Sequence, residues 1–223
     1  MAKAPHCEVI LLRHAHSTAN LKGVLAGRDN RVSLSLRGKG EARDLANFLE
    51  SFEFDAIFAS PLRRCRETIA PFLERTTQKV NYLNELIEME YGDWSGKSLA
   101  TLSKEGLWKV IQSRPSTVRF PGGESFSEMS LRANQAVLEQ AEGRKRILIV
   151  SHGDVIKSIV AFHLGMTLDC FQRISIDPAS LSRIRVPSSQ VISVNETSHL
   201  TALNRVSKSK RDRFTLGGGA GHL

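Results

Sequence analysis

The feature that most restricts the fold of this chain is an alternation of short apolar runs with amphipathic segments. Runs of four apolar residues occupy 9–12, 56–59 and 147–150, and they are too short for helices but long enough for buried strands. The segments between them carry apolar residues at the three- and four-residue spacing of a helix. This order is typical of βαβ units, and it predicts an α/β protein with a largely parallel sheet.

The same patterns predict where the elements begin and end. Helices are expected at 38–51, 62–74, 125–142 and 155–164, with one or two short ones within 99–112. Further strands are expected at 79–83, 182–186 and 191–194, the last two forming a closing hairpin. Ser60 followed by Pro61 is a helix-start signal, because Ser caps a helix well and Pro suits its first position. We therefore expect Ser60 to cap the helix that follows the second strand.

Length and composition fit one globular domain. A chain of 223 residues with 41% hydrophobic and 24% charged residues can bury one core of ordinary size. We expect a single domain over residues 1–206, followed by a tail over 207–223 that is basic, rich in glycine and flexible. The net charge of +8 does not by itself choose among nucleic acid, an acidic membrane surface and an anionic substrate as the partner.

Three features of the sequence indicate a cytoplasmic protein. The apolar segment near the amino terminus stops at Arg13, which makes it too short for a signal peptide. No apolar run reaches the roughly 18 residues that are needed to span a bilayer. The three cysteines, an odd number without metal-ligand spacing, suit free thiols in a reducing compartment. We therefore expect no membrane partner.

Residues that suit phosphate chemistry directly follow three of the predicted strands. Arg13 and His14 follow the first strand, Arg63 lies in the first turn after the second, and His152 follows the strand at 147–150. Open α/β sheets bind ligands at the carboxyl ends of their strands, so we expect these four side chains to converge. The two arginines would make the pocket positive, and their planar groups match phosphate oxygens. Each residue alone is more often structural, but their shared placement favours a phosphoryl site.

Such a site also suggests a reaction. One histidine can act as a nucleophile, taking the phosphoryl group in one step and passing it to water or another acceptor in the next, while a second, protonated histidine binds an oxygen. Arginines stabilise the charge on the phosphoryl oxygens. The leaving alcohol needs a proton donor, and a carboxylic acid with a raised pKa is suitable. Glu85, Glu88 and Glu90, in the loop after the third strand, are three candidates among which residue chemistry does not choose.

Four segments carry recognisable motifs: Leu12-Arg13-His14-Ala15-His16-Ser17-Thr18-Ala19-Asn20, Ser60-Pro61-Leu62-Arg63-Arg64-Cys65-Arg66-Glu67-Thr68, Glu88 through Gly96, and Ser151-His152-Gly153. In order and spacing they resemble the histidine phosphatase superfamily, in its phosphoglycerate mutase-like branch, over roughly residues 8–205. The resemblance implies a three-layer α/β/α sandwich and a phosphotransfer enzyme that needs no metal or other cofactor. Segments 171–174 and 177–180 most resemble an actinobacterial phosphomutase or acid phosphatase branch, which implies a bacterial protein.

The resemblance also implies a role for each matching residue. His14 would be the phosphorylated nucleophile, and Arg13, Arg63 and His152 would hold the phosphoryl oxygens. The family's proton donor lies six residues before the loop tryptophan, which selects Glu88. Further substrate contacts would come from Ser17, Asn20, Gly27, Arg28, Tyr91 and Gly153, and contacts to a second anionic group from Arg28, Lys97 or Arg119.

Departures from the family pattern bear on the acceptor of the phosphoryl group. Ala15 replaces the usual glycine after the nucleophile, and Asp154 stands where the mutases are expected to carry a substrate-binding asparagine. Asp154 would repel a second carboxylate or phosphate. The short stretch between Trp108 and Glu124 lacks the insertion with which cofactor-dependent mutases enclose their substrate. The resemblance therefore favours water as the acceptor, and a phosphatase that acts on a small phosphorylated metabolite.

Three alternatives to a histidine phosphatase stay open. A phosphoglycerate mutase would use the same chemistry with an alcohol as the acceptor. A metallophosphoesterase could use His14, His16, His152 and Asp154 as ligands, although the arginines would repel a dication. A non-catalytic module could bind phosphate or nucleic acid, but with 6% aromatic residues and no aromatic and basic stripe we expect no nucleic-acid partner. The oligomeric state is left open, with a homodimer as one option.

Overall fold

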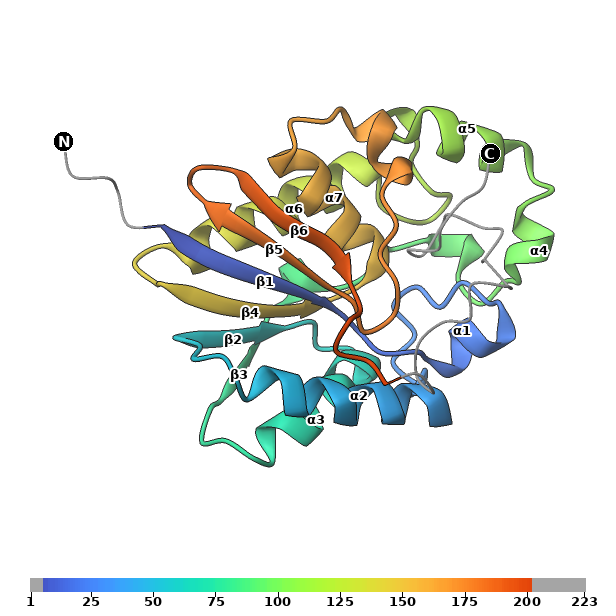
Figure 1. Ribbon diagram of the computed structural model, residues 1–223. Helices are drawn as coiled ribbons and strands as arrows, with labels where there is room; N and C mark the ends of the chain where they lie inside the picture. Colours follow the sequence, from blue (N-terminus) through green and yellow to red (C-terminus); the bar gives the residue numbers. More distant parts are fainter. Residues whose placement is uncertain (1–5, 202–223) are drawn as a thin grey trace.

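The computed structural model of this protein describes residues 6–201, which contain one six-stranded sheet (Figure 1). The strands lie in the order β3-β2-β4-β1-β5-β6. Strands β1 to β4 are parallel, whereas β5 and β6 form an antiparallel hairpin at one edge. The strands are β1 Cys7–Arg13, β2 Ala56–Ala59, β3 Val80–Tyr82, β4 Arg146–Ser151, β5 Leu181–Val186 and β6 Gln190–Glu196. The mixed but mostly parallel sheet that the sequence predicts is confirmed.

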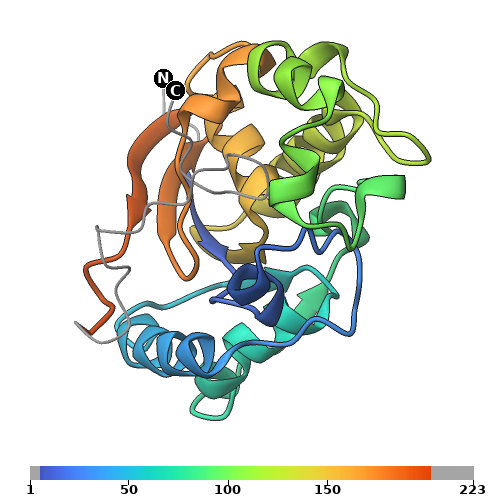
Figure 2. The same ribbon diagram turned by 90° about the vertical axis from the view of Figure 1, so that its right-hand side faces the viewer.

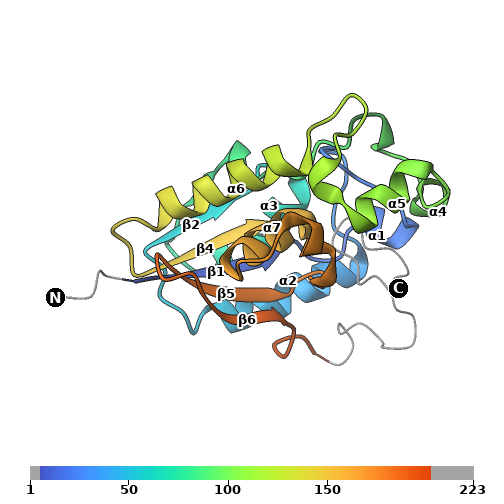
Figure 3. The same ribbon diagram turned by 90° about the horizontal axis from the view of Figure 1, so that it is seen from above.

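Helices cover both faces of this sheet and one of its ends. The α-helices are α1 Thr18–Lys22, α2 Leu36–Leu49, α3 Arg63–Leu73, α4 Leu99–Leu102, α5 Gly106–Ser113, α6 Phe126–Ala141 and α7 Gly153–His163. Short 3-10 helices are η1 Asn84–Leu86, η2 Gly92–Trp94, η3 Pro115–Thr117 and η4 Leu168–Arg173. Helices α1, α4 and α5 gather at the end of the sheet that lies on the right in Figures 1 and 3.

Alternate side chains of the central strands face two separate cores. In β1, Val9 and Leu11 pack with α6 and α7, whereas Ile10 and Leu12 pack with α2 and α3. Every residue of β1 is buried, as expected for a parallel strand with helices on both sides. The result is the expected three-layer α/β/α sandwich, with α2 and α3 below the sheet and α6 and α7 above it in Figures 1 and 2.

The crossover helices define where a ligand can enter. The chain leaves β1 toward α2 on one face of the sheet, but it leaves the neighbouring β4 toward α7 on the opposite face. Neighbouring strands whose helices diverge in this way leave a crevice beyond their carboxyl ends. The residues that follow β1 and β4 therefore meet at a natural binding position of this fold.

The predicted elements are confirmed with shifts of at most two residues in their bounds. The predicted helix cap is wrong. Leu62 is the N-cap of α3, without a side-chain capping bond, and the Ser60 hydroxyl instead lies 2.7 Å from Nε2 of His152. The predicted domain boundary at residue 206 and the tail over 207–223 lie outside the described residues. Within residues 6–201, no helix has both the length and the apolar character needed to cross a membrane.

Candidate active site

His14 lies directly after β1, and its ring is held by the main chain. Its Nδ1 lies 2.8 Å from the carbonyl oxygen of Ala15. A carbonyl oxygen only accepts, so Nδ1 carries the ring proton and the lone pair stays on Nε2. The residue is 4% exposed, and burial, followed by the charges of Arg64 and Arg13, holds the pKa of His14 well below its usual range. His14 is therefore a neutral imidazole with a nucleophilic Nε2.

Two buried arginines accompany His14. Arg13, the last residue of β1, donates from Nη1 to the carbonyl oxygen of Ile176. Arg64, in the first turn of α3, donates from Nη2 to the carbonyl oxygen of Gly27 over 2.8 Å. The Nε of Arg64 has no hydrogen-bond partner among the described residues, although the residue is only 1% exposed. Because a buried N–H without a partner costs free energy, an anion bound beside Arg64 would satisfy it.

Arg63 does not belong to this site, and its assignment to the phosphoryl oxygens from the sequence is wrong. Its side chain is 55% exposed and donates from Nε to Oε1 of Glu67 over 2.6 Å, one turn along the outer face of α3. Adjacent helix residues point about 100° apart, so Arg64 faces inward where Arg63 faces solvent. The sequence carried a signal for this choice, since Arg63 and Glu67 are a complementary pair whereas Arg64 shares its face with Thr68.

His152, the residue after β4, lies next to His14, with ring centroids 5.3 Å apart. Its Nε2 contacts the Ser60 hydroxyl, and its Nδ1 lies 3.8 Å from Oε2 of Glu88. Burial, followed by the charges of Arg64 and His14, holds the pKa of His152 well below its usual range. This lowered pKa favours the neutral ring of His152, whereas the negative charge of a phosphoryl group would favour the protonated ring that the sequence predicts. A neutral imidazole still has one N–H to donate.

Glu88 is the carboxyl group of the site. The residue is 4% exposed, and burial, followed by the charge of Asp154, raises the pKa of Glu88 to about 7 against the opposing charge of Arg64. Near neutral pH, Glu88 thus holds a proton that it can donate. Of the three glutamates that residue chemistry leaves open, only Glu88 lines the cavity described below; Glu85 and Glu90 do not.

The loop that carries Glu88 is anchored through its main chain. Arg132 of α6 donates from Nη1 to the carbonyl oxygens of Glu85 and Ile87 over 2.7 and 2.8 Å. Arg28 donates from Nε to the carbonyl oxygen of Glu88 over 3.0 Å, and its terminal nitrogens pair with two carboxylates outside the cavity. Arg28, which the resemblance suggests as a substrate contact, therefore holds the acid loop in place.

Ser17, Asn20 and Gly27, which the resemblance suggests as substrate contacts, border the same cavity. The main-chain N–H and the hydroxyl of Ser17 both donate to Oδ1 of Asn20, over 2.9 and 2.8 Å, and this capping box begins α1. With Oδ1 used twice, the amide Nδ2 of Asn20 is the group that can donate to a ligand. Gly27 has a φ of +52°, and a Cβ there would lie 2.6 Å from Oγ of Ser95, so a side chain would be strained.

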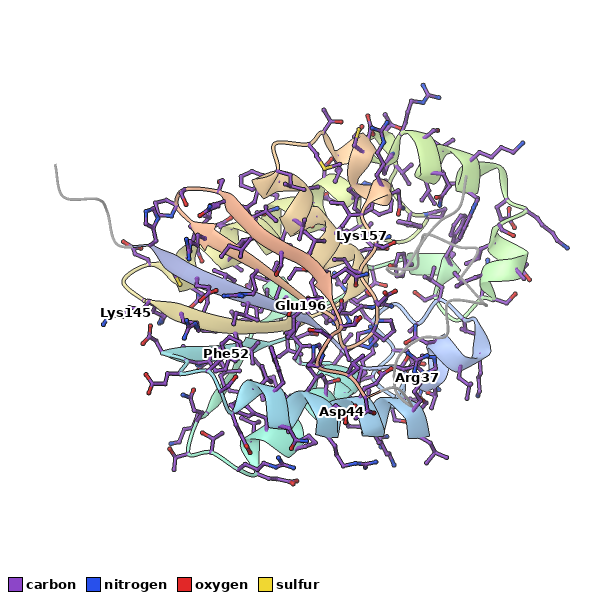
Figure 4. The ribbon with its side chains drawn as sticks, in the orientation of Figure 1. Arg37, Asp44, Phe52, Lys145, Lys157 and Glu196 are labelled. Atoms are coloured by element: carbon purple, nitrogen blue, oxygen red, sulfur yellow. The ribbon has the colours of Figure 1, made fainter. Side chains whose placement is uncertain are left out.

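Tyr91 also lines the cavity, and a buried charge pair holds its hydroxyl. The hydroxyl donates to Oδ2 of Asp154 over 2.6 Å. Asp154 is fully buried, and its Oδ1 lies 3.7 Å from Nζ of Lys157, which is labelled in Figure 4 and donates to Gln172 over 3.0 Å. Asp154 is not among the residues that line the cavity. The prediction that it repels a second substrate anion directly is therefore corrected: it acts through Tyr91 and through the pKa of Glu88.

The remaining residues singled out from the sequence lie away from the cavity. Arg119 pairs with Glu128 at the surface, Lys97 is exposed, and neither lines the cavity. His16, considered as a metal ligand with His14, has its Nδ1 2.8 Å from Oγ of Ser35 and also lies outside. Between residues 6 and 201, no three His, Cys, Asp or Glu side chains are grouped so that they could hold a metal ion.

One small cavity at the carboxyl end of β1 connects these groups. Its volume is about 40 Å³, room for roughly three water molecules, which suits a phosphoryl group. It is lined by Arg13, His14, Ser17, Ala19, Asn20, Val24, Leu25, Ala26, Gly27, Arg64, Glu88, Tyr91 and Leu99. His152 and Gly153 are buried but are not among the lining residues. Sequence reasoning missed Arg64, Ser60 and the apolar lining residues.

Comparison with known proteins gives a consistent picture. A family model described as the histidine phosphatase superfamily (branch 1) matches residues 9–196. Phosphoserine phosphatase 1 of Hydrogenobacter thermophilus is 30% identical over 201 residues, which cover 86% of this chain and 94% of that protein. The 2,3-bisphosphoglycerate-dependent phosphoglycerate mutase 2 of Gloeobacter violaceus is 31% identical over 161 residues, which cover 68% of this chain and 73% of that protein.

Among solved structures, Bacillus stearothermophilus YhfR superposes with a TM-score of 0.79 at 25% identity, covering 87% of this chain and all of that chain (100%). The alignment thus spans nearly all of the part of the chain that the structure describes. Because the family model covers most of the sequence and the fold agrees with it, this chain belongs to the histidine phosphatase superfamily (branch 1) and is an enzyme.

Proposed function

We propose that the protein is a phosphatase that hydrolyses a small phosphorylated metabolite through a phosphohistidine at His14. The observation that carries the proposal is the tautomer of His14. Its Nδ1 donates to a main-chain carbonyl, which leaves a nucleophilic Nε2 in a cavity with two guanidinium groups and one carboxyl group of raised pKa. Phosphoryl transfer needs little besides in-line positioning and stabilisation of charge, and these groups supply both.

In the first step, Nε2 of His14 attacks phosphorus, forming an N–P bond as the P–O bond to the alcohol breaks. The departing oxygen takes the proton of Glu88, so the alcohol leaves neutral and Glu88 becomes a carboxylate. Arg13 and Arg64 donate to the phosphoryl oxygens. The ring of His152 lies beside that of His14, and its Nδ1 has no hydrogen-bond partner among the described residues, so this nitrogen is the group that His152 can offer to the phosphoryl group.

In the second step, water attacks the phosphohistidine. The Glu88 carboxylate takes a proton from this water as its oxygen bonds to phosphorus, and the N–P bond breaks with its electron pair returning to Nε2. Inorganic phosphate leaves, and both His14 and Glu88 return to their starting states. No metal or redox cofactor enters this balance.

A phosphoglycerate mutase is the second candidate, because a mutase from Gloeobacter violaceus is among the relatives of this chain. It would pass the phosphoryl group to an alcohol instead of to water. Among the lining residues that lie within 6–201, Arg13 and Arg64 form one basic pair and no second pair is present, which supports the phosphatase. Incubation with 3-phosphoglycerate, with and without 2,3-bisphosphoglycerate, separates the two: we expect no 2-phosphoglycerate and only slow release of inorganic phosphate, whereas conversion to 2-phosphoglycerate would establish the mutase.

The mechanism is tested by trapping the intermediate. Enzyme mixed with a ³²P-labelled phosphomonoester and quenched in denaturant should carry label that is stable in alkali and labile in acid. His14→Ala should abolish both the label and turnover, whereas His163→Ala, which changes a histidine outside the cavity, should keep both. Activity should also persist in excess chelator. Turnover by His14→Ala at the wild-type rate would refute the nucleophile.

We further propose a cytoplasmic location, on the basis of the three free thiols Cys7, Cys65 and Cys170. A bacterial origin and a homodimer stay predictions from the sequence.

A further inference from the structure

One side of the cavity is built from apolar residues and not from groups that bind anions. Five of its thirteen lining residues are aliphatic, namely Ala19, Val24, Leu25, Ala26 and Leu99. Val24, Ala26 and Leu99 are partly exposed, so they can contact a ligand that enters the cavity. We call these five residues the apolar wall.

The apolar wall is held in shape by main-chain hydrogen bonds between two segments distant in sequence. The N–H of Leu25 donates to the carbonyl of Lys97 over 3.0 Å, and the N–H of Gly96 donates back to Leu25 over 2.8 Å. The N–H of Leu99 donates to Gly23 over 2.8 Å, and Val24 bridges to Ser98. A preformed surface of this kind loses little conformational entropy when it binds a ligand.

The two arginines that line the cavity would both be taken up by the phosphoryl group. Within residues 6–201, Arg13 and Arg64 are the only cationic side chains in the lining. Arg28 binds the acid loop and two carboxylates, and Arg119 pairs with Glu128. A second anion placed against the apolar wall would therefore lose its hydration to aliphatic groups, since the exposed residue Lys97 does not line the cavity.

We propose that the substrate is a phosphomonoester whose alcohol is uncharged and largely apolar, an alkyl or aryl alcohol that packs on the apolar wall. The inference rests on the proposed phosphatase function and narrows its substrate. It excludes phosphorylated carboxylates and bisphosphates as preferred substrates. Each methylene that the wall removes from water should raise kcat/KM roughly fourfold, until the wall is covered.

The test compares n-alkyl phosphates from ethyl to hexyl with the same chains bearing a terminal carboxylate, using the full chain. We expect kcat/KM to rise along the alkyl series, and butyl phosphate to exceed 4-phosphooxybutanoate by at least about tenfold. Leu99→Ala should flatten the rise, and Leu99→Arg should reverse the preference toward the carboxylate. Leu21→Ala, an exposed residue of α1 outside the cavity, is the matched control and should leave the series unchanged.

The outcomes separate this inference from the function on which it rests. A flat alkyl series, or a preference of the unmodified protein for the carboxylate, would overturn the apolar substrate while hydrolysis itself upholds the phosphatase. Failure to hydrolyse any ester, with no acid-labile label on the protein, would overturn the phosphatase and with it the substrate class. Loss of the rise in Leu21→Ala as well as in Leu99→Ala would also count against the wall.

Discussion

Replacing each of two adjacent arginines in turn gives the sharpest test of the site. Arg64 is 1% exposed, lines the cavity, and bonds the carbonyl of Gly27, whereas the Arg63 side chain is 55% exposed and bonds Glu67. The two side chains are chemically identical and begin one residue apart. A difference in the effect of their removal therefore measures position alone.

The magnitudes follow from these environments. A preorganised donor to a developing oxyanion is worth about 10²- to 10³-fold in kcat, or about 2.7–4 kcal/mol, so Arg64→Ala should lower kcat/KM by at least that factor. Arg63→Ala removes the solvent-exposed ion pair of Arg63 with Glu67, one helical turn away, which contributes about 0.3–0.5 kcal/mol to stability. It should change kcat/KM less than twofold. Arg64→Lys keeps the charge but loses the planar fork, and should fall between wild type and Arg64→Ala.

The assay is steady-state hydrolysis of p-nitrophenyl phosphate at pH 6, with circular dichroism and thermal unfolding to confirm that each variant is folded. Arg64 also supports the loop at Gly27, so Arg64→Lys guards against loss of activity through misfolding. An Arg63→Ala variant that loses as much activity as Arg64→Ala, or a folded Arg64→Ala variant with wild-type activity, would refute the assignment of Arg64.

Three further predictions concern the proton donor and the packing of the site. Glu88→Gln should lower kcat/KM for alkyl phosphates by about 10²- to 10⁴-fold but much less for p-nitrophenyl phosphate, whose leaving group needs no proton; equal losses would argue against general acid catalysis. For the free enzyme, kcat/KM should fall as pH rises through about 7, because Glu88 loses its proton there. Asp154→Asn should move this fall to lower pH, because it removes a negative charge that raises the pKa of Glu88. An unmoved profile would contradict that coupling. Gly38→Ala should destabilise the fold by about 1–3 kcal/mol in urea unfolding, since its Cβ would lie 1.9 Å from the carbonyl oxygen of His16. Gly106 has open space around it, so Gly106→Ala is the control and should not destabilise the fold.

Much of the fold could be predicted from the sequence because its central strands β1 and β4 are almost entirely buried. A strand with helices on both faces must be continuously apolar, and the runs at 9–12 and 147–150 show this without ambiguity. Because such strands are parallel, the polar residues that directly follow them lie together at the carboxyl-terminal edge of the sheet. The positions of His14 and His152 at this rim needed no tertiary information.

What sequence reasoning could not supply is the direction of individual side chains. The choice between Arg63 and Arg64 depends on the phase of a helix that begins one residue later than expected. Ser60 carries a capping signal, but its hydroxyl contacts His152, which follows β4 and is distant in sequence. Asp154 looked like a repulsive group at the site, yet its charge is compensated within the core by Tyr91 and Lys157. The last two errors arise from contacts across long sequence separations, of Ser60 with His152 and of Tyr91 with Asp154.

The hydrogen bond from His14 to the carbonyl oxygen of Ala15 has a consequence for how this sequence can vary. A side chain that orients a catalytic imidazole can be lost by a single mutation, but a main-chain carbonyl is present whatever residue follows His14. The fixed tautomer is therefore robust to substitution at position 15, provided that the new side chain fits the buried space and keeps the backbone N–H bonded to Thr68. This explains how alanine can replace glycine beside the nucleophile. The main-chain carbonyl of residue 15 orients the His14 ring whatever the side chain, so a substitution at that position leaves the nucleophilic Nε2 in place.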